Sequence, residues 1–109
     1  MDIGKAIKEL RKVKLITQKE LAIRCGITPN ALCNIEKGIS FPSQSNIQKI
    51  CDAMCIPPSY LLLFSITEED VPEEKRFFFH QLCEPLKDGL VRGLNKNDND
   101  KEKQERSHQ

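Results

Sequence analysis

The sequence contains no tryptophan, a single tyrosine and two histidines, and it has no apolar run near the roughly 20 residues that a membrane-spanning helix needs. Residues 1–14 follow an amphipathic helical pattern and lack the apolar core of a signal peptide. We therefore expect no membrane association and a cytoplasmic location. No nucleophile elbow, phosphate-binding loop or paired-carboxylate pocket is visible, so we expect neither an enzyme nor a bound cofactor.

Cysteine is present, but not in a pattern that indicates disulfides. The five cysteines are an odd number and form no CxxC pair, so we interpret most of them as small buried apolar residues. A metal site would have to combine Cys51 and Cys55 with His80 and Cys83. These two pairs belong to separate segments, so no metal site is expected. Cys33 is the one candidate for a redox-sensitive thiol.

Positive charge is concentrated in the N-terminal part of the chain. The net charge of the whole sequence is only +1, but residues 1–64 carry nine basic and five acidic side chains, an excess of +4. Residues 65–94 carry four basic and seven acidic side chains, and residues 95–109 carry four of each. A polyanion would therefore meet the N-terminal part first.

The apolar spacing predicts helices throughout and no strands, so the fold class is all-α. We expect five helices in a compact domain of residues 1–65, near residues 3–14, 18–24, 29–37, 43–55 and 58–64. Thr17 and Glu20 form a capping-box pattern, and Gly26 is a stop signal. Thr28 is an N-cap before Pro29. Leu15 and Ile16 are expected to form an apolar corner.

The remainder of the chain divides into two further parts. Residues 66–94 are expected to form an additional C-terminal helical segment that starts near Pro72 and is kinked or ended by Pro85. Residues 95–109 are polar, charged and free of aliphatic side chains, so we expect a disordered tail.

The second and third predicted helices carry the functional prediction. A short second helix followed by a tight turn at residues 25–27 is typical of a helix-turn-helix, in which the third helix is directed outward. Such a helix can enter the major groove of DNA with its N-terminal residues nearest the base edges.

The segment TQKELAIRCGITPNALCNIEKGISFP resembles the DNA-binding domain of the lambda-repressor and Cro family, also called the Xre family. The resemblance covers residues 3–64 and implies a five-helix lambda-repressor-like domain that binds double-stranded DNA. The positions that carry it are Thr17, Gln18, Glu20, Leu21, Ala22, Gly26, Ile27, Leu32, Ile35, Glu36, Gly38 and Pro42.

The resemblance also implies roles for individual residues. Gln18 matches a glutamine that contacts a DNA phosphate and braces the recognition helix, and Arg11 and Glu36 match a structural ion pair. Asparagine can bind adenine through both its donor and its acceptor, which makes Asn30 and Asn34 the candidate base readers. Candidates for the remaining DNA contacts are Thr28, Pro29, Ala31 and Lys37.

One departure from the family lies in the loop after the third helix. Family members often carry basic residues there, whereas this loop reads Ile39-Ser40-Phe41 and leaves only Lys37 nearby. We therefore expect low affinity from a single domain and a shallow dependence of binding on salt.

The C-terminal segment is predicted to form a homodimer, because three consecutive phenylalanines cannot all point inward on one helix. The candidate interface residues are Phe78, Phe79, Leu82 and Leu86. The alternative is that the segment folds back over its own domain.

The leading functional prediction is a transcriptional repressor that binds a palindromic operator as a homodimer. Two alternatives stay open. The chain is an antitoxin or restriction-system controller with a protein partner on its C-terminal segment, or it is a protein-interaction adaptor that no longer binds DNA.

Overall fold

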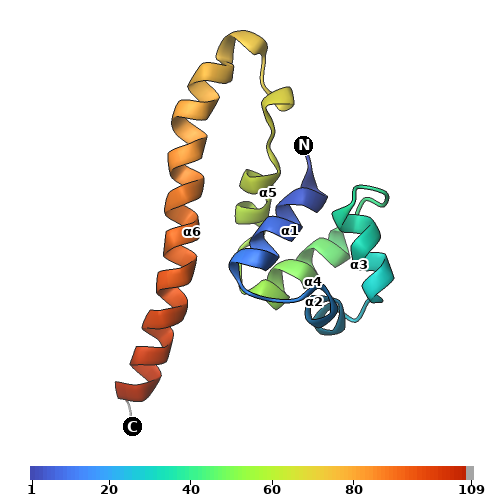
Figure 1. The fold of residues 1–109 in the computed structure, drawn as a ribbon, viewed down its shortest axis with the longest axis vertical. Helices are drawn as coiled ribbons and strands as arrows, with labels where there is room; N and C mark the ends of the chain where they lie inside the picture. Colours follow the sequence, from blue (N-terminus) through green and yellow to red (C-terminus); the bar gives the residue numbers. More distant parts are fainter. Residues whose placement is uncertain (108–109) are drawn as a thin grey trace.

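The structure is a computed structural model that describes the backbone of residues 1–107 and the side chains of residues 1–94. Within this described part the regular structure is entirely helical, as Figure 1 shows. The elements are α1 (Ile3–Val13), α2 (Gln18–Cys25), α3 (Pro29–Glu36), α4 (Gln44–Met54), α5 (Pro58–Ser65), the short 3₁₀ turns η1 (Glu68–Asp70) and η2 (Glu73–Lys75), and α6 (Arg76–Ser107).

Helices α2, α3 and α4 each begin at a hydroxyl side chain that caps the first turn. The hydroxyl oxygens of Thr17, Thr28 and Ser43 accept hydrogen bonds from backbone N–H groups three residues later, at 3.0–3.1 Å. The predicted capping box is modified, because the Glu20 carboxylate accepts from the Thr17 hydroxyl at 3.1 Å rather than from the Thr17 backbone. These caps set where each helix starts and therefore the lengths of the turns between them.

The core is made by side chains from all five N-terminal helices. α1 packs on α3 and α5, and α2 packs on α3 and α4. Each fully buried aliphatic side chain contributes about 1.5–3 kcal/mol of hydrophobic stabilisation. The largest of them are Ile7, Leu10, Leu21, Leu32, Ile50, Met54 and Leu61.

The corner between α1 and α2 differs from the prediction at one residue. Ile16 is buried, but Leu15 is 90% exposed and adopts a left-handed backbone conformation with φ of 57°. The Leu15 N–H bonds to the Lys12 carbonyl and the Ile16 N–H bonds to the Arg11 carbonyl. This is the pattern of a Schellman motif, which places Leu15 in the position usually held by glycine and turns its side chain toward solvent.

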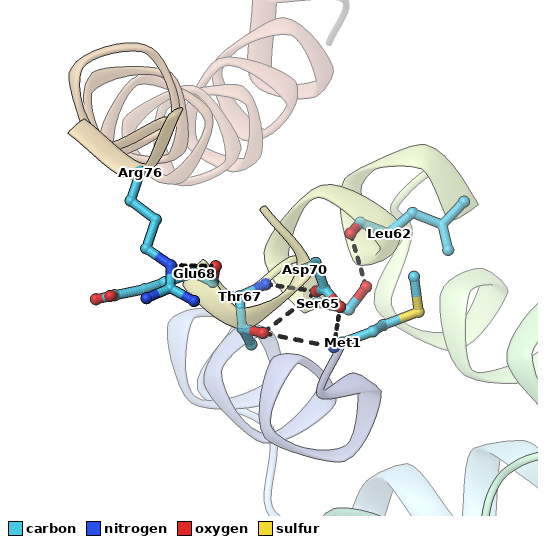
Figure 2. Close-up of polar contacts among 7 residues, drawn as sticks. All are labelled: Met1, Leu62, Ser65, Thr67, Glu68, Asp70 and Arg76. Carbon is cyan, nitrogen blue, oxygen red and sulfur yellow. Dashed lines mark hydrogen bonds and ion pairs between the residues drawn. The ribbon is translucent and has the colours of Figure 1, made fainter. Parts of the chain in front are cut away.

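The connector between α5 and α6 is tied to the start of the chain, as Figure 2 shows. The Met1 ammonium bonds to Asp70 Oδ1 at 2.7 Å, and Asp70 Oδ2 accepts from the Thr67 backbone N–H at 2.9 Å. These bonds lower the pKa of the Asp70 carboxyl below its ordinary value. The Arg76 guanidinium donates to the Glu68 carbonyl at 3.1 Å and so joins the connector to the first turn of α6.

Helix α6 is longer than predicted. It runs through Pro85 without ending there and continues to Ser107. Proline at this position removes one intrahelical donor, but the hydrogen bonds on either side of it keep the helix continuous. The expected disordered tail is helical over residues 95–107, and the lysine, glutamate, glutamine and arginine residues at 101–106 favour a helix. Residues 108–109 lie outside the described part of the chain.

One face of α6 is held against the N-terminal domain. Leu94 is buried with the core, and the Lys87 ammonium lies 5.9 Å from the ring centre of Phe64 and 6.0 Å from that of Phe79. His80 Nε2 lies 3.2 Å from a carboxylate oxygen of Glu68 in the connector. α6 therefore has one face toward the domain and an opposite face that turns away from it. None of the described helices is long and apolar enough to cross a membrane.

Candidate nucleic-acid interface

Helices α2 and α3 are joined by a short turn in which Gly26 has a left-handed backbone conformation, with φ of 70°. The Gly26 N–H bonds to the Ile23 carbonyl at 3.1 Å, and the Ile27 N–H bonds to the Ala22 carbonyl at 3.0 Å. The chain then leaves the turn at Thr28, which caps α3. Glycine adopts this backbone conformation at little cost, and the predicted helix-turn-helix is built on it.

Helix α3 presents its N-terminal half and one side to solvent. Pro29, Asn30 and Lys37 are exposed, and Ala31 and Asn34 are partly exposed. Leu32, Ile35 and Glu36 are buried on the opposite side. The residues predicted to read bases therefore lie together on the outward side of the helix that is predicted to enter the groove.

The two asparagines of α3 have amide groups available for a partner. Asn30 and Asn34 are four residues apart and lie on the same side of the helix. Among the residues whose side chains are described, neither amide group takes part in a hydrogen bond. An asparagine amide offers one acceptor and two donor hydrogens, which suits the edge of an adenine base.

The C-terminal end of α3 is held by Arg11 and Glu36, the two residues that the resemblance implies as an ion pair. Arg11 Nε lies 3.0 Å from Glu36 Oε2 and Arg11 Nη2 lies 3.0 Å from Glu36 Oε1, a two-pronged ion pair that is largely buried. A third nitrogen of Arg11 donates to the Ile16 carbonyl at 3.0 Å. α1, the corner before α2, and the end of α3 are thereby joined.

Gln18 completes this network from the first turn of α2. Its Nε2 donates to Glu36 Oε1 at 3.3 Å, and its side chain is only partly exposed. The contact joins the first turn of α2 to the last turn of α3. One amide hydrogen and the carbonyl oxygen of Gln18 are left for other partners.

The loop after α3 is held in a defined conformation. The Asn34 carbonyl accepts from the backbone N–H groups of Ile39 at 2.9 Å and Ser40 at 3.2 Å, and Gly38 has φ of 80°. Ile39 is 70% exposed and Phe41 is 75% exposed. The loop thus presents two apolar side chains beside the candidate interface.

The four residues predicted for dimerisation do not all lie on the same face of α6. Phe78, Leu82 and Leu86 are exposed on the outward face of α6. Phe79 is half-buried, its ring lies 5.5 Å from that of His80, and it borders the space between α6 and the domain. A helix rotates by about 100° per residue, which turns Phe79 from the face of Phe78 toward the domain.

Only two of the five cysteines are fully buried, so the prediction that most of them are buried packing residues is wrong. Cys25 and Cys51 are buried, Cys33 and Cys83 are half-buried, and Cys55 is exposed. Burial raises the pKa of the Cys25 thiol and raises that of Cys51 to about 11, with a smaller contribution from Asp52. Within the described residues, no three His, Cys, Asp or Glu side chains are grouped so that they could hold a metal ion.

Sequence reasoning missed the role of Gly4. This glycine is buried in the first turn of α1, and its α-carbon lies against the backbone carbonyls of Ile35 and Glu36 at the end of α3. The available signal was a glycine inside an otherwise regular apolar stripe, which often marks a close approach of two backbones.

Comparison with known protein families agrees with this geometry. A family model described as helix-turn-helix matches residues 7–61, which is half of the chain. The chain belongs to this helix-turn-helix family. The match begins within α1 and ends within α5, and it includes every residue of α2, the turn and α3, so it covers the candidate interface and stops before α6. The domain is a helix-turn-helix of the DNA-binding type.

Two curated relatives of this chain are both named multiprotein-bridging factor 1, from the yeasts Debaryomyces hansenii and Candida albicans. Each is 38% identical over 50 residues, which cover 46% of this chain and 33% of the relative. The similarity therefore concerns about a third of each relative and a domain-sized part of this chain.

Proposed function

We propose that this protein is a sequence-specific transcriptional regulator, a repressor that binds a palindromic operator as a homodimer in the cytoplasm. The observation that carries the proposal is the outward side of α3, where two asparagine amides without intramolecular partners lie on a braced helix. Repression would follow from occupying a promoter. A groove-binding helix needs to be rigid, because each misplaced base contact loses both affinity and specificity.

The proposed contacts divide into base reading and phosphate binding. Asn30 and Asn34 read adenines, and Pro29 and Ala31 offer apolar contact to a thymine methyl group. Gln18 and Lys37 contact phosphates, and Thr28 lies at the same end of α3. Phosphate contacts set the position of the protein on the duplex, and base contacts choose the sequence.

A dimer supplies what one domain lacks. A single domain contacts few base pairs, whereas two copies related by a twofold axis double the interface and read half-sites about 34 Å apart. The exposed apolar face of α6, with Phe78, Leu82 and Leu86, supports the C-terminal segment as the source of that dimer.

The deciding experiment is a selection of bound duplexes from a random pool by the full chain. The expected product is a palindrome in which each half-site contains adenines that are lost when Asn30 or Asn34 is replaced by alanine. Recovery of an unenriched pool would contradict sequence-specific binding. A half-site without its mirror image would support DNA reading and contradict the homodimer.

The loop at residues 39–41 favours a second candidate, a protein-interaction adaptor. Ile39 and Phe41 expose apolar surface at a place where basic residues would strengthen binding to phosphates. A salt titration with mixed duplex DNA separates the two functions. For a regulator, the logarithm of the binding constant should fall linearly with the logarithm of the salt concentration, with a slope of about one for each phosphate neutralised. For an adaptor, the binding constant should not depend on salt in this way.

A protein partner on α6, as in an antitoxin or a restriction-system controller, is compatible with DNA binding. Stable co-purification of the full chain with one second small protein, in place of a homodimer, would favour that form of the proposal.

A further inference from the structure

The solvent side of α1 carries a narrow row of positive charge. Lys5, Lys8 and Lys12 are exposed. They are three and four residues apart, so they follow one another along one side of the helix, and we call them the lysine strip. The buried residues of α1 lie on the opposite side and are Ile3, Gly4, Ala6, Ile7 and Leu10. The strip therefore faces away from the core over most of the length of α1.

The charges of the lysine strip are not neutralised within the protein. Among the residues whose side chains are described, none of the three ammonium groups takes part in an ion pair or a hydrogen bond. Glu9 is the one acidic residue between Lys5 and Lys12 in the sequence, and it lies at the edge of the strip. The solvent side of α1 therefore keeps an excess of positive charge that is available to a partner.

The lysine strip adjoins the place where α1 meets α3, two helices that pack on each other (Figure 1). Gly4 lies against the backbone carbonyl of Glu36, and Arg11 bonds to the carboxylate of the same residue. Lys8 is four residues after Gly4 and three before Arg11, so it lies beside this contact. Lys37, which directly follows Glu36, is also exposed. A basic surface therefore runs from the C-terminal end of α3 onto α1.

We propose that the lysine strip binds the phosphates of the DNA duplex on which α3 lies. The inference rests on the proposed function and adds a contact surface to it. Lys5 and Lys12 are about 10 Å apart along the axis of α1, because each residue rises about 1.5 Å. A DNA strand carries one phosphate about every 3.4 Å along its axis, so the same length of strand holds about three phosphates. The duplex backbone thus matches the strip in both charge and length.

The loop after α3 favours the same assignment. Residues 39–41 supply no cation, and Ile39 and Phe41 present apolar surface instead. With the lysine strip in contact, the phosphates near the C-terminal end of α3 are neutralised from α1 rather than from this loop. The dependence of binding on salt is then steeper than the loop and Lys37 alone predict. An acidic protein segment is the other possible occupant of the strip, and the position of the strip beside α3 favours DNA over it.

A triple variant of the full chain, Lys5→Gln, Lys8→Gln and Lys12→Gln, tests the proposal. Fluorescence anisotropy would measure binding to a mixed-sequence duplex and to the duplex selected from a random pool, each over a range of salt concentrations. The slope of log binding constant against log salt should become shallower by about three, because three phosphates keep their counterions. Affinity at about 0.1 M salt should fall by roughly tenfold or more. The ratio of the two affinities should not change, since phosphate contacts do not read sequence.

Two control variants separate the lysine strip from net charge and from folding. Lys49→Gln, Lys75→Gln and Arg92→Gln together remove the same charge from exposed positions on α4, η2 and α6, and this variant should keep the wild-type slope. Replacing the three residues of the strip by arginine keeps the charge and should also keep the slope, because a phosphate accepts from either cation. Circular dichroism should show full helix content in all variants, because every replaced side chain is exposed.

The outcomes separate this inference from the proposed function. A chain that selects a site, but whose glutamine variant keeps the full slope, overturns the role of the lysine strip and leaves the regulator standing. A loss confined to the selected duplex also overturns it, because contacts to phosphates weaken binding to every sequence. A slope that falls only in the glutamine variant of the strip supports the proposal, even if no sequence is selected, which would contradict the sequence-specific regulator alone. Wild-type binding that does not depend on salt overturns both.

Discussion

The α-carbon of Gly4 faces the carbonyl oxygen of Ile35 so closely that a β-carbon at position 4 would overlap that oxygen. The same β-carbon would lie 3.0 Å from the carbonyl oxygen of Glu36. The first turn of α1 therefore packs backbone to backbone against the last turn of the recognition helix. This contact fixes the position of the C-terminal end of α3, next to Asn34.

Gly4→Ala should destabilise the protein by about 1–3 kcal/mol, because the added methyl group must displace backbone atoms rather than a flexible side chain. Urea denaturation followed by circular dichroism would measure the change. The matched control is Gly89→Ala, studied at concentrations at which the chain is monomeric. Nothing lies near Gly89, so that variant should be neutral or more stable by up to about 1 kcal/mol. Equal effects of the two substitutions would contradict the close packing.

The Arg11–Glu36 pair should show strong coupling in a double-mutant cycle. Arg11→Met should cost about 3–5 kcal/mol, because the buried Glu36 carboxylate loses its charged partner. Glu36→Leu alone leaves the arginine without its acceptor. The double variant should be markedly more stable than the sum of the single effects predicts, since neither charge is then buried alone. Additive losses in urea denaturation would mean that the two side chains act independently.

Asn34→Ala and Lys37→Ala should affect DNA binding in different ways. Asn34→Ala should cost roughly 1–3 kcal/mol on the preferred site and relax the preference at one base position. Lys37→Ala should weaken binding to all sequences similarly and reduce the salt slope by about one. Binding titrations on the selected site, its single-base variants and a mixed duplex would measure both effects. Identical profiles for the two variants would contradict these assignments.

Cys51 should make folding stability depend on pH in the alkaline range. Its pKa is about 11 in the folded protein and 9.0 in its ordinary environment, so the folded state holds the thiol proton more tightly. The resulting contribution to stability is complete below pH 9 and is lost as the pH rises toward 11. The difference in unfolding free energy between the wild type and Cys51→Ala should therefore shrink over this range, by at most roughly 3 kcal/mol.

The helix-turn-helix could be predicted from the sequence because its signals are local. Thr17 and Thr28 each cap the helix that follows them, Gly26 supplies the turn, and apolar spacing marks the buried side of each helix. A reader of the sequence needs no tertiary information for these signals, because each acts within a few residues.

The parts that could not be predicted depend on contacts between distant residues or on a balance of small energies. Gly4 is required by a carbonyl more than 30 positions away in the sequence. The direction of Phe79 depends on the phase of α6 relative to the domain. Continuation of α6 through Pro85 depends on whether the surrounding turns outweigh the cost of about 3 kcal/mol for a proline inside a helix.

The hydrogen bond from the Asp2 N–H to the Ser65 carbonyl, at 2.8 Å, brings the two limits of the five-helix unit to one point. A short glycine linker could therefore join them, and new termini could be opened in a surface loop without changing how the helices pack. In the unpermuted chain, a protein fused at either limit of the five-helix unit would emerge from the same corner of the domain.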